Sequence, residues 1–214
     1  EFPHLMNLIE QNQFDTIYHE HFSYFSLYTV IKLFKSHQLD VYDVDQIPTH
    51  GGSLRIYCRH YNHSENISAS IKITELLKKE ESIGMKTLPY YNNFESKVIK
   101  VKNNLVNFLY KQKKENKTVI AYGAAAKGNT LLNYCGIQSD LIQFVCDAAP
   151  SKQGKYLPGS HIPIFPPAML RERKPDIILI LPWNLKKEVI AQHGYVREWG
   201  GKFITAIPKI SVVA

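Results

Sequence analysis

The chain has 214 residues, of which 44% are hydrophobic and 21% charged, a balance typical of a globular protein that buries a core. No apolar run approaches the roughly 20 residues that span a bilayer, so the sequence predicts no transmembrane helix. The net charge of +7 comes largely from lysines in polar stretches that lack zinc-finger or RNA-binding motifs, which favours solvated helix faces over a nucleic-acid site.

The cysteines and the N-terminus predict a cytoplasmic protein with free thiols. Cys58, Cys135 and Cys146 are widely spaced and form no CxxC pair, which favours a reducing compartment over a disulfide framework. The N-terminus lacks the basic-then-apolar order of a signal peptide. Residues 1–5 read as a strand end running into a helix, so we expect a fragment from which an upstream portion is missing.

A helix and a β-hairpin are predicted next along the chain. Apolar residues in the range 24–37 recur at the three- and four-residue spacing of an amphipathic helix. Residues 39–47 and 54–57 are rich in β-branched and aromatic side chains, as strands are. The turn HGGSLR at residues 50–55 is read primarily as the hairpin connection, in which two glycines supply positive φ.

Two further helices are predicted to bridge two domains. The first covers residues 66–81, and the second covers residues 94–114, where apolar residues form one stripe at helical spacing.

From residue 118 the pattern changes to short apolar runs separated by helical or loop segments, which is typical of a parallel sheet with crossover helices. The predicted strands are 119–122, 142–146, 177–181 and 203–207. The predicted helices are 129–135, 167–172 and 185–198. The proline-rich residues 158–167 are predicted to be loop, because proline lacks the donor that a helix or central strand needs. The fold class is therefore α/β, with a Rossmann-like parallel sheet at the C-terminus.

A candidate phosphate loop, GAAAKG at residues 123–128, follows the first of these strands and leads into a helix. The N–H groups of a helix N-terminus and the charge of Lys127 suit a pyrophosphate. The spacing is neither the dinucleotide fingerprint nor the P-loop motif, so the alternative is that the glycines serve only tight packing. Asp147 stands near the position of the ribose-binding acid in dinucleotide folds.

The residues Pro182, Trp183 and Asn184 follow the strand at 177–181 directly. Open α/β sheets bind ligands at the carboxyl ends of their strands, so Trp183 is a candidate to stack on a base or sugar. A tryptophan that caps the core is the alternative reading.

The cluster YHEH at residues 18–21 brings a phenol and three titratable groups together in four consecutive positions. A His/Glu pair is suited to general-base chemistry, since the carboxylate raises the proton affinity of the imidazole and fixes its tautomer. Metal binding by His19 and His21 needs an extended backbone and a third ligand, and no third ligand stands at zinc spacing, so no metal site is predicted. A polar loop that satisfies helix ends is the alternative to catalysis.

Five stretches in this order resemble a known family. They are DTIYHEHFSYFSL at 15–27, HGGSLR at 50–55, GAAAKG at 123–128, the KQGK-to-HIP stretch at 152–163, and PWN at 182–184. Together they resemble the C-terminal region of SAM-dependent sugar C-methyltransferases, which act on dTDP-linked 4-keto deoxysugars, and the likeness covers nearly the whole chain. Ala125 departs from the proline of several relatives, which leaves the backbone donors in place.

The resemblance implies a domain organisation. Residues 1–62 would be the end of the SAM-dependent catalytic domain, 63–117 a helical linker, and 118–214 a Rossmann-like domain that binds the nucleotide-sugar. Members of the family carry zinc in an N-terminal segment and SAM in a central domain. This chain has no acidic-x-Gly-x-Gly motif, so SAM is expected mainly in the missing upstream domain and the fragment is expected to be inactive alone.

The resemblance also implies a mechanism in which a base removes the acidic proton beside the sugar ketone and the resulting enolate attacks the SAM methyl group. His21 is the expected base, Glu20 orients it, Tyr18 contacts the sugar or assists reprotonation, and His19 completes the catalytic cluster. The expected contacts of the substrate nucleotide are Gly123, Ala124, Ala125, Lys127, Asn129, Trp183 and Asn184. The expected partner is a dTDP-sugar, with neither nucleic acid nor membrane.

Two other functions remain open from the sequence. The glycine loop and Asp147 also suit a stand-alone nucleotide-binding or NAD(P)-dependent module. A purely structural docking domain with an empty crevice is the third reading.

Overall fold

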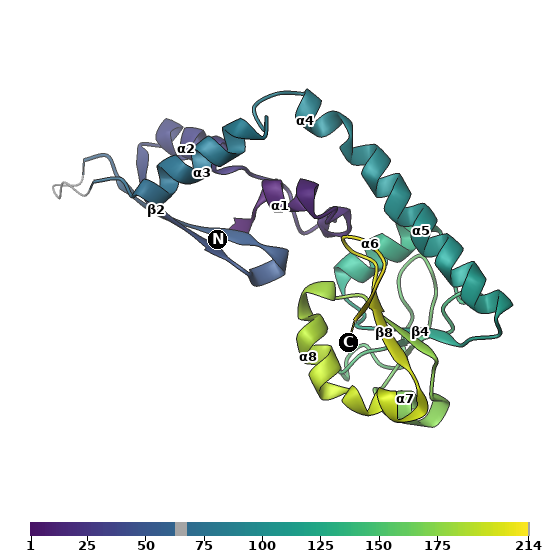
Figure 1. Cartoon of the computed structure of the whole chain (residues 1–214). Coiled ribbons are helices and arrows are strands. Elements are labelled where there is room, and N and C mark those ends of the chain that lie inside the picture. The colour runs from purple at the N-terminus through teal and green to yellow at the C-terminus, as the bar shows by residue number, and fades with distance from the viewer. Residues whose placement is uncertain (63–67, 214) are drawn as a thin grey trace. The chain divides into compact units, whose positions relative to one another are not determined.

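The computed structural model describes residues 1–62 and 68–213. The chain forms two compact units, each with its own sheet (Figure 1). The N-terminal unit comprises Glu1–Gln13 and His21–Glu95, and the C-terminal unit comprises Phe14–Glu20 and Ser96–Ala214. A short segment from the first part of the sequence therefore belongs to the C-terminal unit.

The N-terminal unit is a three-stranded antiparallel sheet with helices. Its elements are β1 (Phe2–Pro3), α1 (Leu5–Glu10), α2 (Leu27–Ser36), β2 (Leu39–Ile47), η2 (Thr49–Gly51), β3 (Ser53–His60), α3 (Ile71–Ser82) and α4 (Pro89–Asn92). The strand order is β1-β3-β2, with β2 and β3 paired as a hairpin. Both the hairpin and the strand-to-helix start of the chain confirm the sequence predictions. Gly51 and Gly52 adopt positive φ in the turn, as expected.

Two helices of this unit start later than predicted because serine side chains cap them. Ser26 Oγ accepts a hydrogen bond from Thr29 N at 3.1 Å, so α2 begins at Leu27 and the predicted start at residue 24 is wrong. Ser70 caps α3 in the same way, through Lys72 N. Residues 66 and 67, where that helix was predicted to start, lie outside the described residues.

A buried carboxylate on α3 fixes the start of α2. Glu80 Oε1 accepts hydrogen bonds from His4 Nε2 and Leu27 N, both at 2.7 Å, and Oε2 accepts from Tyr28 N at 3.0 Å. Burial alone would raise the pKa of Glu80, but the hydrogen bonds from His4 and the two amides outweigh it and lower the pKa. Glu80 therefore ties α3 to this unit.

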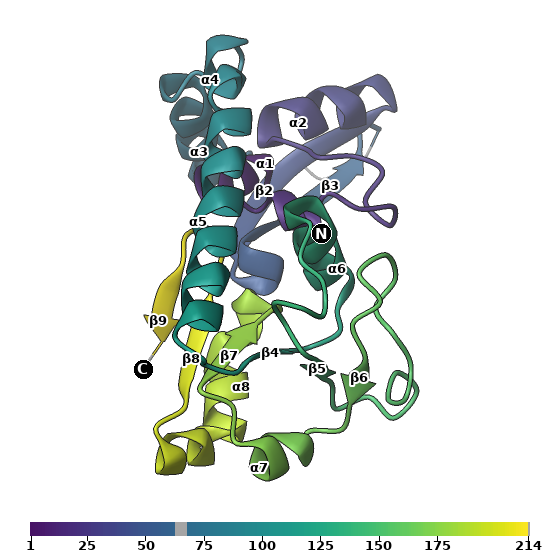
Figure 2. The same ribbon diagram turned by 90° about the vertical axis from the view of Figure 1, so that its right-hand side faces the viewer.

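The C-terminal unit contains a six-stranded sheet. Its strands are β4 (Val119–Tyr122), β5 (Val145–Cys146), β6 (Ile164–Phe165), β7 (Ile177–Ile180), β8 (Lys202–Thr205) and β9 (Ser211–Val213). The order is β6-β5-β4-β7-β8-β9, which Figure 2 shows from right to left, and only β9 runs antiparallel to its neighbour. This is the strand order of doubly wound nucleotide-binding folds, and it confirms the predicted Rossmann-like sheet.

The helices of this unit are α5 (Phe94–Lys114), whose first two residues belong to the N-terminal unit, α6 (Ala126–Cys135), α7 (Met169–Arg173) and α8 (Lys186–Gln192). The bounds of α5 are those predicted. Helix α6 begins three residues before the predicted start, so it includes the end of the candidate phosphate loop. The predicted helix at 185–198 is instead divided at His193 into α8 and the 3₁₀ helix η4 (Gly194–Trp199).

Strand β6 corrects another prediction. The proline-rich residues 158–167 were predicted to be loop throughout, but Ile164 and Phe165 pair in parallel with β5 at the sheet edge. Pro163 and Pro166 flank the strand, so the donors they lack fall outside its two paired residues. On the side away from β5, Ile164 N donates to Lys155 O at 2.8 Å. The predicted strand at 142–146 shortens to Val145–Cys146.

The three cysteines are free, as expected, with Cys135 and Cys146 buried and Cys58 exposed. Among the described helices, none is long and apolar enough to cross a membrane.

Candidate functional site

The predicted nucleotide residues gather at the carboxyl ends of two adjacent strands. Strands β4 and β7 are parallel, with Tyr122 opposite Ile180 at their last paired positions. The chain leaves β4 into Gly123 and leaves β7 through Leu181 into Pro182 and Trp183. The chain continues from β4 to β5 on one side and from β7 to β8 on the other, so the two connections lead toward opposite edges of the sheet. Such a switch point is where doubly wound folds bind ligands.

The two glycines of the loop are required for packing. Gly123 has φ 91°, and a Cβ on it would lie 2.5 Å from Pro182 Cδ. A Cβ on Gly128 would lie 2.8 Å from a side-chain carbon of Leu181, so α6 passes close to the end of β7. The glycines are thus explained without a ligand, and the argument for a ligand depends on the other groups of the loop.

The N-terminus of α6 presents donors that the helix itself does not use. Ala125 stands at the N-cap and provides no side-chain cap, and the first helical hydrogen bond runs from Asn129 N to Ala125 O at 3.1 Å. The amides at 126–128 therefore have no acceptor within the helix. The free amides at 126–128 have the arrangement that suits an anion at a helix N-terminus. Asn129 Oδ1 is buried and has no hydrogen-bond partner among the described residues, but as an acceptor it suits a donor group rather than an anion.

Lys127 lies beside this N-terminus and is held by the segment that follows β7. Its side chain is nearly buried, with the whole residue 8% exposed. Nζ donates to Asn184 Oδ1 at 2.8 Å and lies 4.8 Å from the centroid of the Trp183 ring, a cation–π contact. Burial lowers the pKa of Lys127, and the charge of Asp15 opposes that shift. The structure thus brings together Lys127, Trp183 and Asn184, which the sequence had placed in two separate motifs.

Asp147 holds the loop closed. Its Oδ2 accepts from Ala124 N at 2.7 Å, and its Oδ1 accepts from Ala149 N at 2.8 Å. Lys152 Nζ donates to Ala124 O at 2.8 Å and lies 3.3 Å from Asp147 Oδ2. The sequence had placed Asp147 near the position of a ribose-binding acid, whereas in the structure both carboxylate oxygens are engaged by the backbone. The amide of Ala124 is likewise already paired.

Asp15 is the residue that sequence reasoning missed. It lies in η1 (Phe14–Thr16) of the C-terminal unit, and none of its surface is exposed. Its Oδ2 accepts a hydrogen bond from Trp183 Nε1 at 2.7 Å, while Oδ1 is buried and has no hydrogen-bond partner among the described residues. In the sequence it was noted only as the first residue of the stretch at 15–27, and no role was assigned to it.

Burial raises the pKa of Asp15 to about 6, although the hydrogen bond from Trp183 and the charge of Lys127 act in the opposite direction. The carboxyl group is therefore largely ionised at neutral pH and adds a buried negative charge to the surroundings of Lys127.

The predicted catalytic cluster lies on the loop between η1 and α2. Tyr18 is half-buried and its ring centroid is 6.2 Å from that of His19, while His19 and Glu20 are exposed. All three belong to the C-terminal unit. His21 begins the next segment of the N-terminal unit, where its ring centroid is 6.3 Å from that of Tyr24. The first and last of the four residues are thus half-buried, and the two between them are exposed.

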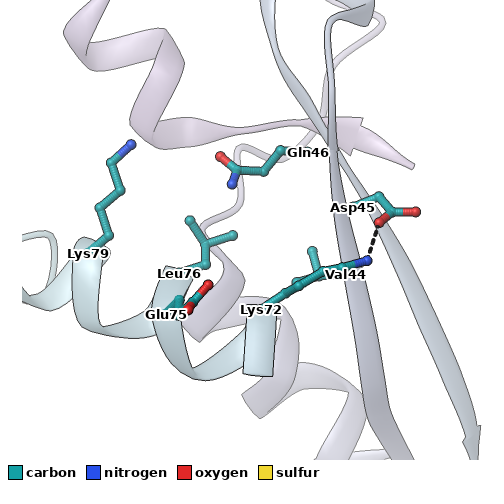
Figure 3. Close-up of a pocket in the computed structure, with 7 residues that line it drawn as sticks. All are labelled: Val44, Asp45, Gln46, Lys72, Glu75, Leu76 and Lys79. Carbon is teal, nitrogen blue, oxygen red and sulfur yellow. Dashed lines mark hydrogen bonds and ion pairs between the residues drawn. The ribbon is translucent and has the colours of Figure 1, made fainter. Parts of the chain in front are cut away.

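Within residues 1–62 and 68–213, no three His, Cys, Asp or Glu side chains are grouped so that they could hold a metal ion. A pocket of about 340 Å³ lies between β2 and α3 in the N-terminal unit (Figure 3). Lys72 crosses one side of it to Asp45, with 2.7 Å between Nζ and Oδ1. None of the predicted site residues lines this pocket, and we assign it no role.

The chain matches a family model and a curated protein. Residues 48–208 match the family model described as C-methyltransferase C-terminal domain. Over 214 residues the chain is 38% identical to the C-methyltransferase NovU of Streptomyces niveus. The match covers 100% of this chain and 50% of the relative, so the chain spans half the length of that protein.

Proposed function

Because the chain belongs to the C-methyltransferase C-terminal domain family, we propose that it is part of a SAM-dependent enzyme that methylates a carbon of a nucleotide-linked 4-keto deoxysugar. One observation carries the proposal beyond the family. The segment Phe14–Glu20, which leads to His21, belongs to the same unit as the lysine-bearing N-terminus of α6. This observation supports a proposal in which residues 18–20 of the candidate catalytic loop belong to the same unit as the substrate-nucleotide site.

The C-terminal unit recognises the nucleotide part of the substrate in this proposal. The diphosphate binds at the α6 N-terminus, where the amides at 126–128 and Lys127 supply donors and positive charge. The turn residues Gly123 and Ala125 and the side chain of Asn129 border it. Since the amide of Ala124 is paired with Asp147, this residue contributes through the shape of the loop. The nucleoside lies toward Trp183 and Asn184, and dTDP is the proposed nucleotide.

The chemistry is assigned to the loop at residues 18–21. His21 takes the proton from the carbon beside the ketone, which leaves the electron pair on that carbon and the ketone oxygen. Glu20 orients the imidazole, Tyr18 contacts the sugar or returns a proton, and His19 borders the site. SAM, when bound, supplies the methyl group. The eleven glycines of this chain include no SAM motif, so we place SAM, and any zinc, outside these residues.

Replacement of the proposed base tests the function. In the full-length protein, His21→Ala should lower methyl transfer to a dTDP-linked 4-keto deoxysugar by about 10²–10⁴-fold, because positioned proton transfer contributes that much. SAM affinity, measured by calorimetry, should stay unchanged. His37→Ala is the matched control, since His37 is exposed just after α2. Turnover that survives His21→Ala would show that His21 is not the base.

A stand-alone NAD(P)-binding module is the second candidate, and the strand order of the sheet favours it. The geometry of Asp147 argues against it, because both of its oxygens already accept backbone amides and Oδ2 also lies 3.3 Å from Lys152 Nζ, so the acid serves to close the loop. We therefore place the nucleotide-sugar function first. We also place the protein in the cytoplasm, which the free cysteines support, with neither nucleic acid nor membrane as a partner.

A further inference from the structure

We propose that Asp15 is a positioning residue. It couples the position of the catalytic loop, residues 18–21, to the binding of nucleotide in the crevice at the carboxyl ends of β4 and β7. The inference rests on the proposed function and adds a role for a residue that contacts neither the reacting carbon nor the methyl group. Asp15 lies three residues before Tyr18 and six before His21. Any contact that holds Asp15 in place therefore limits the positions in space that the first residues of the catalytic loop can take.

Two contacts attach this segment to the C-terminal unit. Phe14 packs against Tyr134 of α6, with ring centroids 5.1 Å apart. Asp15 accepts the hydrogen bond from Trp183, which stands in η3 (Trp183–Leu185) directly after β7. Helix α6 and η3 follow the two strands of the switch point, so the segment is attached on both sides of the proposed nucleotide crevice.

The same contacts reach the proposed phosphate site through Lys127. The ring of Trp183 donates its N–H to Asp15 and presents its face to Lys127 Nζ. Lys127 is therefore one side chain away from Asp15 and stands in the first turn of α6, where the diphosphate is placed. A bound phosphate changes the charge that Lys127 presents to Trp183 and to the buried carboxylate. The burial of Asp15 makes it sensitive to that change, because charges interact strongly away from water.

Coupling of this kind is reciprocal. If the anchored segment favours nucleotide binding, then bound nucleotide must favour the anchored segment by the same factor. An aspartate that served only as a structural cap would leave the segment indifferent to nucleotide. This difference gives the proposal a readout that is separate from stability.

Hydrogen exchange on the full-length protein with dTDP as the probe measures this coupling. In the wild type, saturating dTDP should slow exchange at amides 14–20 by at least threefold, and in Asp15→Ala it should leave them unchanged. Calorimetry of dTDP on the same samples separates two failures. Binding of dTDP without a change at 14–20 in the wild type overturns the coupling alone, whereas no binding of dTDP overturns both the coupling and the nucleotide site.

The kinetics of graded variants give a second readout. Asp15→Asn keeps an oxygen that accepts from Trp183, whereas Asp15→Ala does not. The value of kcat should therefore be lower in Asp15→Ala than in Asp15→Asn by about tenfold or more. The Kd of dTDP should rise by less than about tenfold in either variant. Rates are referred to the folded fraction of each preparation, and if Asp15→Ala does not fold, the hydrogen exchange of the wild type with dTDP still decides the proposal. Equal kcat in the wild type and both variants would overturn the proposal.

Discussion

Asp15 carries a buried charge that is only partly compensated. One carboxylate oxygen accepts from Trp183, whereas the other has no hydrogen-bond partner in the part of the chain that the structure describes. Burial raises the pKa of the group from its ordinary 3.8 to about 6, against the effects of Trp183 and Lys127. Such a carboxylate is costly to ionise, and it is more easily explained at a functional position than as a stabilising contact.

The pH dependence of stability should carry the signature of this carboxylate. Its folded-state pKa is raised, so protonation contributes stability that is fully present below the unfolded pKa of about 4 and is lost as the pH rises through about 6. Relative to Asp15→Asn, the wild type should therefore gain about 1 kcal/mol in free energy of unfolding between pH 7 and pH 5. Denaturant unfolding of the two proteins at both pH values measures this gain. The same pH dependence in both would contradict the raised pKa.

Sequence reasoning recognised some residues of the candidate site and not others for a physical reason. Lys127, Trp183 and Asn184 lie within five residues of a strand end, where a local pattern predicts ligand binding. Asp15 has its partner 168 residues away, and no local pattern encodes that contact. Asp147 was recognised by its position, but the hydrogen bond that it accepts from the loop amide of Ala124 becomes visible only in three dimensions.

At the scale of elements, the turn from β4 into α6 packs so closely against the end of β7 that Gly128 has no room for a side chain. Gly128→Ala should destabilise the C-terminal unit by about 1–3 kcal/mol, since a Cβ there would overlap the side chain of Leu181. Gly194→Ala is the matched control, because its Cβ would meet Arg197 at 3.5 Å, an ordinary contact. Urea unfolding of both variants measures the difference. Equal losses in the two variants would mean that α6 does not depend on this close approach.

Strands and helices were predictable where a single pattern continues without interruption. The apolar stripe of α5 predicted both ends of that helix correctly. The predicted bounds of β2 and β4 also agree with the observed ones. Strand β6 was missed because two prolines flank it and its pairing depends on an edge position that the sequence does not reveal. The start of α2 was placed too early because aromatic residues continue the apolar pattern upstream of the Ser26 cap.

At the scale of the whole molecule, the two units interleave along the sequence. Phe14–Glu20 belongs to the C-terminal unit, although the residues on both sides of it belong to the N-terminal unit. Within the range 63–117 proposed as a linker, α3 packs in the N-terminal unit and most of α5 belongs to the C-terminal unit. Contiguous ranges derived from sequence patterns cannot represent such an arrangement, because membership in a unit depends on packing between distant segments.

The central claim is that the C-terminal unit recognises the nucleotide of the substrate while the loop at residues 18–21 acts on the sugar. Methyl transfer by the full-length protein tests it most directly, with SAM labelled in the methyl group and a 4-keto deoxysugar offered with and without its dTDP group. We predict label on a sugar carbon and a value of kcat/KM at least about 100-fold higher for the nucleotide-linked sugar, because binding energy from the nucleotide contributes to the reaction. Equal kcat/KM for the two sugars, or no label on carbon, would contradict the claim.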